Sequence, residues 1–280
     1  MLLGTLQICN EELRAEEIKE ICDSLNDNSI RSLSLRGCKV HDDDFKKLME
    51  SLKECKAIFV MVSTRQWYCL HAKCKLSVYL KTQRVVPVVG LHGTSLGDEG
   101  LECLMPALQA HPKLQSLDFG DCQLGDEGIR QICTLLPPSE GRQGLMDLTL
   151  SANPSISPQG WTQLAIAIAA NSQLCFLYPD YNNIGDNEAR VLSVALAASS
   201  TLERVDLEGC NIGEKGGEMF FTVLANYPTR MVELVLTETG ISADLIGQIN
   251  DCLNQKMQDS EEQESLDKSV EEEEKSKDAA

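Results

Sequence analysis

A pattern of apolar residues recurs along the chain with one fixed spacing, and this recurrence constrains the fold more than any other feature. Leu35 is followed at offsets +3, +5, +13 and +17 by Cys38, Val40, Leu48 and Leu52. The same template, with small or polar exceptions, starts again at Ile8, Leu91, Phe119, Leu207 and Leu236. An internal period of about 28 residues predicts a solenoid, in which each unit buries its apolar face against its neighbours.

The spacing of the anchor positions predicts nine units. With Leu150 and Pro179 included, the successive steps between anchors are 27, 56, 28, 31, 29, 28 and 29. Because 56 is twice 28, we expect one degenerate unit between Leu52 and Pro87.

Each unit is predicted to be a short strand, a turn and a helix. The alternation in Leu33-Ser34-Leu35 has the period of two of a strand, and the apolar positions from +10 to +17 lie on one face of a helix. Gly-Asp turns lie between them, and we expect Asp98, Asp126 and Asp186 to cap their own helices. A metal or phosphate loop is the alternative, but the turn recurs at the repeat period and lacks the ligand spacing of a calcium loop.

The motifs at 33–38, 148–154 and 205–209 resemble those of the leucine-rich repeat family, in its ribonuclease-inhibitor-like class with alternating repeats of two similar lengths. The resemblance covers residues 1–257. It implies an α/β horseshoe with a parallel sheet on the concave face and helices on the convex face, without a nucleotide-binding domain. It implies no defined biochemical activity.

Two places depart from the pattern. In residues 56–86 Ser63 occupies the anchor position, which indicates a family-specific insertion or an altered exon or gene-model boundary; we favour the second. Zinc binding by Cys69, His71 and Cys74 is a weaker interpretation, because a second ligand pair is missing, so the sequence predicts no metal and no cofactor. Pro179 lacks an N–H at an anchor, so we expect strand pairing to be interrupted there.

The residues that flank the buried strand leucines are predicted to form the concave face. Acids outnumber bases there from Asp118 onward, and we expect Asp118, Asp147, Asp180, Asp206 and Glu233 to form one stripe beside Tyr178 and Tyr181. The complete candidate protein-binding set is Asp118, Asp121, Asp147, Tyr178, Asp180, Tyr181, Asp206, Glu208 and Glu233. Simple solvation of an exposed sheet is the alternative; we favour binding because parallel sheets are usually covered.

Composition limits the partners of this face. The chain has 43 acidic and 25 basic residues, a net charge of −18, and no basic block is apparent, so we expect a basic protein partner and no nucleic acid. The apolar stretches 57–62 and 164–170 are far shorter than the roughly 20 residues of a membrane span, so no membrane insertion is expected.

Residues 258–280 carry ten acids and three lysines; they are predicted to be a disordered, solvating tail, with a docking role as the alternative.

The remaining signals favour a non-catalytic, monomeric scaffold. The chain has no apparent secretory signal, and its twelve cysteines are spread from Cys9 to Cys252, which indicates reduced, buried thiols and a cytoplasmic or nuclear location. The common nucleotide, metalloprotease and serine-hydrolase motifs are absent, so we expect no enzyme. The alternative function is regulation of an enzyme, as a ribonuclease-inhibitor-like inhibitor or as a GTPase-activating protein of the Ran type.

Overall fold

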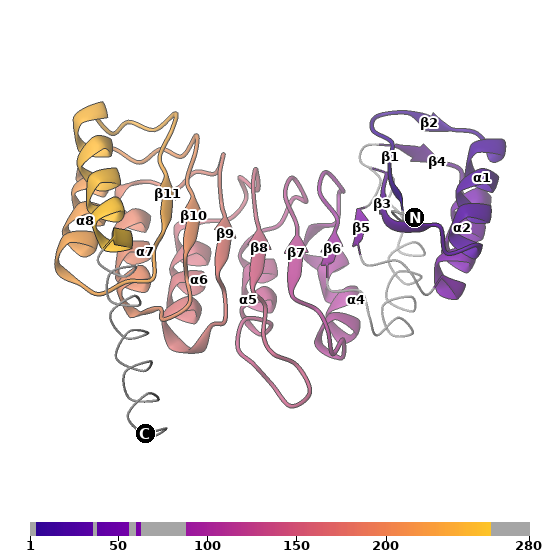
Figure 1. The fold of residues 1–280 in the computed structure, drawn as a ribbon, viewed down its shortest axis with the longest axis horizontal. Coiled ribbons are helices and arrows are strands. Elements are labelled where there is room, and N and C mark those ends of the chain that lie inside the picture. The colour runs from indigo at the N-terminus through magenta and orange to yellow at the C-terminus, as the bar shows by residue number, and fades with distance from the viewer. Residues whose placement is uncertain (1–3, 36–37, 56–59, 63–87, 259–280) are drawn as a thin grey trace, which may run out of the picture.

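The computed structural model describes residues 4–35, 38–55, 60–62 and 88–258, which alternate between strands and helices (Figure 1). The strands of the main sheet are β1 (Gly4–Gln7), β3 (Ile30–Ser34), β5 (Val60–Val62), β6 (Val88–Gly90), β7 (Ser116–Asp118), β8 (Asp147–Thr149), β9 (Phe176–Tyr178), β10 (Arg204–Asp206) and β11 (Glu233–Val235). They form one parallel sheet in chain order, and β2 (Glu12–Leu13) pairs separately with β4 (Lys39–Val40). The nine predicted units therefore each supply one strand of the sheet.

The helices form the second layer, on the opposite side of the sheet from the concave face (Figure 1). They are α1 (Ala15–Asn26), α2 (Asp42–Glu54), α4 (Gly97–Gln109), α5 (Asp126–Cys133), α6 (Pro158–Asn171), α7 (Asp186–Ala198) and α8 (Glu214–Asn226), followed by a helix over 243–258. Neighbouring helices pack against one another, as α7 does against both α6 and α8. The predicted α/β horseshoe is confirmed.

The degenerate unit supplies a strand in register with its neighbours. Strand β5 lies between β3 and β6, and Met61 pairs with Leu33 on one side and Val89 on the other. The weak anchor at position 63 therefore does not prevent this unit from joining the sheet. Cys69, His71 and Cys74, and the tail from residue 259 onward, lie outside the described residues.

The core lies between the sheet and the helices, as the period of two requires. In each strand from β7 to β10 the central residue is at most 2% exposed, whereas its two neighbours are half-buried on the concave face. The helices add large side chains, among which Trp161 of α6 is 1% exposed. This alternation places every second strand side chain on one accessible surface.

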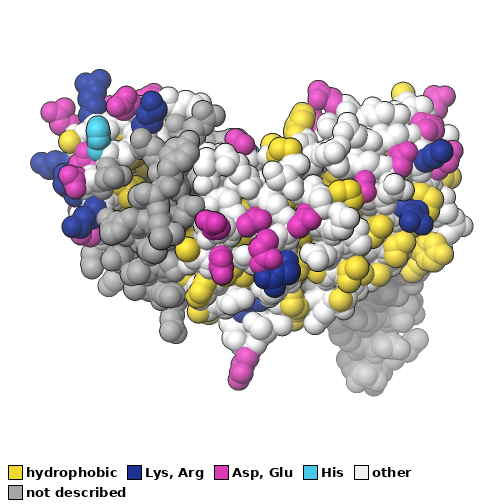
Figure 2. Space-filling model, turned by 180° about the vertical axis from the view of Figure 1, so that it is seen from behind, with side chains coloured by type: hydrophobic (Ala, Val, Ile, Leu, Met, Phe, Trp, Pro, Cys, Tyr) yellow, Lys and Arg dark blue, Asp and Glu magenta, His cyan; other side chains and the backbone are white. Residues whose placement is uncertain are grey.

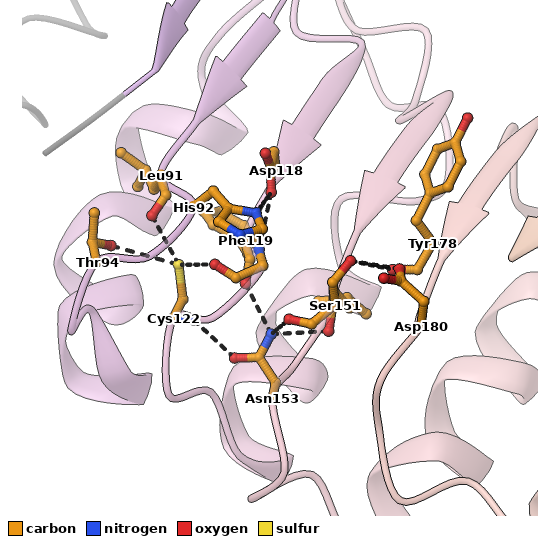
Figure 3. Close-up of polar contacts among 12 residues, drawn as sticks. Leu91, His92, Thr94, Asp118, Phe119, Cys122, Ser151, Asn153, Tyr178 and Asp180 are labelled. Carbon is orange, nitrogen blue, oxygen red and sulfur yellow. Dashed lines mark hydrogen bonds and ion pairs between the residues drawn. The ribbon is translucent and has the colours of Figure 1, made fainter. Parts of the chain in front are cut away.

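A buried hydrogen-bond ladder at the +3 position joins consecutive units (Figure 3). The Asn153 amide nitrogen donates to the carbonyls of Phe119, Leu150 and Ser151, and its amide oxygen accepts the backbone N–H of Cys122 and Leu124. Asn182 repeats the arrangement one unit later and accepts the N–H of Asn153. The side chain at +3 thus satisfies backbone groups that have no partner within the turn itself.

Cysteine fills the same ladder position in other units. The Cys122 thiol donates to the carbonyl of Leu91 and lies 3.5 Å from the Thr94 hydroxyl. Burial raises the pKa of Cys122 to about 12, and that of Cys210 to about 11. These thiols are structural, as the sequence predicted, because a buried thiol held in the protonated form is a poor nucleophile.

The aspartates of the Gly-Asp turns cap the helix of the following unit, so the prediction that they cap their own helices is wrong. Asp98 accepts the N–H of Gly125 at 2.8 Å, and Asp126 accepts the N–H of Ser157 at 2.8 Å. Asp186 accepts the N–H of Gly213 at 2.7 Å in the same way. Each carboxylate lies at the positive end of the next helix and thereby joins two units.

We expect Asp126→Ala to lower the free energy of unfolding by about 1–2 kcal/mol, because it removes the carboxylate that holds Ser157, the N-cap residue of α6. Asp126 accepts both the backbone N–H and the hydroxyl of Ser157. The control is Glu127→Ala, an exposed neighbour whose carboxylate bonds only within α5. Urea denaturation measures both variants, and equal losses would show that the cap of the next unit is unimportant.

The interruption predicted at Pro179 is confined to one position. The flanking anchors donate across the sheet, from Leu150 to Tyr178 and from Leu207 to Val235, whereas proline has no N–H for the equivalent bond. Accordingly β9 and β10 pair at two positions rather than three. Pairing resumes at Tyr181, whose N–H donates to the carbonyl of Glu208 at 2.7 Å. The solenoid therefore continues through the proline.

Several hydrophobic side chains are exposed on the convex surface (Figure 2). Ile166 on α6 and Val194 on α7 are 61% and 59% exposed, and α6 contains no charged residue. The acidic side chains that define the candidate site lie instead on the sheet and in the turns that follow its strands.

Candidate functional site on the concave face

The acids of the concave face lie in three rows, because the strands pair in register. The first row contains Asp147, Phe176, Arg204 and Glu233, and the second contains Asp118, Thr149, Tyr178 and Asp206. Asp180 and Glu208 follow their anchors and belong to a third row with Ser151. The predicted single stripe is therefore wrong: its five acids are divided among the rows, although all of them lie on the predicted face.

The first row combines a half-buried acid, Asp147, with an ion pair. Burial raises the pKa of Asp147, the charge of Asp118 raises it further, and a hydrogen bond from Ser116 lowers it. Two strands away, Arg204 Nη1 lies 3.0 Å from Glu233 Oε2. This row therefore presents one carboxylate that a nearby cation would stabilise and one that already has a cation beside it.

The second row has two acids, Asp118 and Asp206, with an aromatic residue between them. Asp118 accepts the N–H of Gly120 at 3.0 Å and lies 3.2 Å from Nδ1 of His92, as Figure 3 shows. Asp206 accepts the N–H of Glu208 at 3.0 Å, and burial raises the pKa of Asp206 in spite of that bond. Tyr178 lies between them with its ring half-buried.

Two acids of the third row are held by hydroxyl groups. The Ser151 hydroxyl donates to Asp180 at 2.5 Å, and the Tyr181 hydroxyl donates to Glu208 at 2.5 Å. The bond to Glu208 raises the pKa of Tyr181 to about 12. These contacts fix the carboxylates on the rim of the sheet.

The turn after each anchor determines where Tyr181 and Asp121 lie. Both residues have left-handed backbone, with φ of 55° and 48°, and both side chains are exposed. A methyl group on Gly209 would lie 2.5 Å from the Tyr181 ring, so only glycine lets this ring pack across the next unit. The candidate residues thus lie on the sheet and in the turn that follows each strand. Most of the acids already accept a hydrogen bond or form an ion pair within the chain.

Sequence reasoning left Arg204 and His92 out of the candidate site. Both occupy concave positions of the repeat, so the signal was present in their offsets from the anchors. The acid-based prediction omitted them, whereas on this face His92 contacts Asp118 and Arg204 pairs with Glu233.

We expect Asp147→Asn to stabilise the fold slightly at pH 7, by less than about 1 kcal/mol after screening by solvent. The folded state raises the pKa of this carboxyl and so holds its proton more tightly than the unfolded chain. The ionised form is therefore a cost at neutral pH, and the cost is relieved as the pH falls toward the raised pKa. The gain from the substitution should shrink in that range, measured by denaturation against pH.

The control for this measurement is Asp251→Asn, an exposed position in the last helix. It should show no comparable gain at neutral pH. A destabilising effect of Asp147→Asn at pH 7 would mean that the hydrogen bond from Ser116 outweighs the cost of burial.

Within the described residues, no group of His, Cys, Asp and Glu side chains has the arrangement of a metal site. Over the same residues, no helix combines the length and apolar character that crossing a membrane would require.

Comparisons with known proteins agree with this architecture. The family model for the leucine-rich repeat matches residues 110–133 and 198–221. Leucine-rich repeat-containing protein 73 of Rattus norvegicus and of Homo sapiens are each 43% identical to the chain over 256 residues, covering 91% of this chain and 81% of theirs. Ribonuclease inhibitor of Mus musculus is 28% identical over 155 residues, covering 54% of this chain and 33% of that protein.

Among solved structures, a chain from the complex of Rad7 and Elc1 in yeast has a TM-score of 0.55 and 16% identity. The likeness covers 86% of this chain and 66% of that one, and it concerns the fold alone.

In the described units from β6 to β11, a parallel strand, a ladder residue at +3 and a convex helix define a leucine-rich repeat solenoid with ribonuclease-inhibitor-like repeats. The extent of the similarity then gives the narrower assignment. The chain belongs to the family of leucine-rich repeat-containing protein 73. Leucine-rich repeat proteins generally mediate protein–protein interactions.

Proposed function

We propose that the chain is a non-catalytic scaffold whose concave face binds a basic protein partner. The observation that carries this proposal is the placement of two acids, Asp147 and Asp206, half-buried on strands of this face, where burial raises the pKa of each. A carboxylate with a raised pKa is unfavourably placed as an anion, so a cation brought beside it gains electrostatic energy. Residues 88–258, which contain the whole candidate site, have 21 acids and eight Lys or Arg residues.

The second candidate function is regulation of an enzyme by binding. The similarity to ribonuclease inhibitor favours it, because an inhibitor of that type acts as a binding protein. In that case the same concave acids would contact the enzyme. The two candidate functions share one binding face and differ only in whether the bound partner is an enzyme that the chain regulates. We propose further that the chain is monomeric and cytoplasmic or nuclear, with residues 258–280 as a solvating extension.

The test of the proposed face uses isosteric variants and basic peptides. We expect the triple variant Asp147→Asn, Asp206→Asn and Glu208→Gln to weaken binding of a Gly-Arg repeat peptide by about 10-fold or more at low salt, measured by calorimetry. Its control is Glu99→Gln, Glu127→Gln and Glu218→Gln on the helices, which removes the same charge from exposed positions. Equal binding by both triple variants would reject the concave face.

Proximity labelling in cells tests whether the concave residues that bind the peptide also bind natural partner proteins. The intact chain and its concave triple variant are compared, each normalised to the helix variant. We expect a set of basic proteins to be labelled less by the concave variant. Identical labelling by all three chains would contradict the proposed function even where the peptide binds.

A further inference from the structure

Arg204 is the only Lys or Arg at the concave positions of β7–β11. It lies in the first row, and acids occupy positions in all three rows around it. Its position matters for binding, because a basic partner that approaches this face meets a cation already in place.

The Arg204 side chain contacts two neighbouring strands. Its guanidinium carbon lies 5.7 Å from the centroid of the Tyr178 ring on β9, and its Nη1 lies 3.0 Å from Glu233 Oε2 on β11. An aromatic face on one side and a carboxylate on the other are the two groups that recognise guanidinium in proteins. Arg204 thus occupies an arginine-binding arrangement that the same chain supplies.

The contacts of Arg204 are incomplete. Its Nε is buried and makes no hydrogen bond, although the side chain as a whole is 38% exposed and that of Glu233 is 49% exposed. An ion pair this exposed contributes little to stability. Because Nε donates to no acceptor, the guanidinium makes fewer hydrogen bonds than its N–H groups allow. Displacing Arg204 from Tyr178 and Glu233 therefore costs the folded protein little stability. A guanidinium group of a partner can compete for the same two side chains.

We infer that the Tyr178 ring and the Glu233 carboxylate form a subsite for an arginine side chain of the partner, which Arg204 fills until the partner displaces it. This inference rests on the proposed function and adds the side chain that is recognised. Arginine is expected rather than lysine, because a planar guanidinium stacks on a ring and can donate two parallel bonds to a carboxylate. Arg204 then acts as a specificity residue that excludes weakly basic ligands.

The test compares Arg204→Gln with Arg190→Gln, an exposed position on α7, so that both variants change the net charge equally. The probes are two synthetic peptides, a Gly-Arg repeat and a Gly-Lys repeat of the same length. We expect Arg204→Gln to bind the Gly-Arg peptide about 5- to 10-fold more tightly than wild type, with a smaller gain for Gly-Lys. Arg190→Gln should bind both peptides within about 2-fold of wild type.

A double variant tests whether the gain in peptide affinity depends on the Glu233 carboxylate of the subsite. Adding Glu233→Gln to Arg204→Gln should remove the gain for the Gly-Arg peptide, and thermal denaturation should show that both variants remain folded. The inference is overturned if Arg204→Gln binds no better than Arg190→Gln, or if it binds more weakly, as it would if Arg204 only held Tyr178 and Glu233 in place.

The same measurements separate this inference from the proposed function. If wild type binds the Gly-Arg peptide and the concave triple variant does not, while Arg204→Gln behaves as Arg190→Gln does, only the subsite is refuted. If no chain binds either peptide, both the subsite and binding of basic partners by this face are refuted.

Discussion

Replacing Trp161 by alanine should lower the free energy of unfolding by about 4 kcal/mol. The Trp161 side chain is the largest of the fully buried residues in the described part of the chain, is 1% exposed, and belongs to the hydrophobic core on the buried face of α6. Its indole nitrogen is buried without a hydrogen-bond partner, so the loss comes from packing and from the cavity that remains. Urea denaturation followed by circular dichroism measures the change.

The control is Ile166→Ala in the same helix. Ile166 is 61% exposed, and alanine has the higher helix propensity, so this variant should stay within about 0.5 kcal/mol of wild type. Amide exchange should place the effect of Trp161→Ala mainly in the units of α5, α6 and α7, because each unit packs only on its neighbours. Similar losses for both variants would contradict the assignment of Trp161 to the core.

Asn153→Ala should destabilise the fold by about 3 kcal/mol, although it removes only a small side chain. Asn153 is fully buried, and its amide serves three carbonyls and two backbone N–H groups of adjoining turns. Alanine leaves these groups in the interior without that partner, and a buried unsatisfied polar group costs about 1–3 kcal/mol. The measurement is again chemical denaturation, with amide exchange at Cys122 and Leu124.

Asn183→Ala provides the matched control, since Asn183 is exposed and its side-chain oxygen accepts a bond from the exposed Asn211. It should change the free energy of unfolding by less than about 0.5 kcal/mol. If Asn153→Ala were as mild as this control, water would have to replace the amide within the ladder.

The sequence predicted the fold well because one physical requirement repeats in every unit. Leu33 and Leu117 are buried strand residues for the same reason, and the strand around Met61 was located by arithmetic on the spacing alone. The ladder position was also visible, since a small polar or thiol side chain recurs at +3, as at Cys122 and Asn153.

The candidate site was predicted less well, because offsets along one unit were not compared between units. Asp118, Asp147 and Asp180 lie at −1, −3 and +1 from their anchors, and strand register converts these offsets into different rows. The contacts of Arg204 with its neighbours depend on side-chain direction, which the pattern does not specify. The forward direction of the Asp126 cap likewise follows from the stacking of helices and not from the motif.

The two kinds of bond between units point in opposite directions along the chain. Asp126 reaches forward to the helix of the next unit, whereas Asn153 reaches back to the turn of the preceding one. Deleting part of a unit would leave a donor on one side and an acceptor on the other without partners. Insertion of one whole unit restores both kinds of contact, so a protein of this type can change its length in evolution or by engineering in steps of one complete repeat.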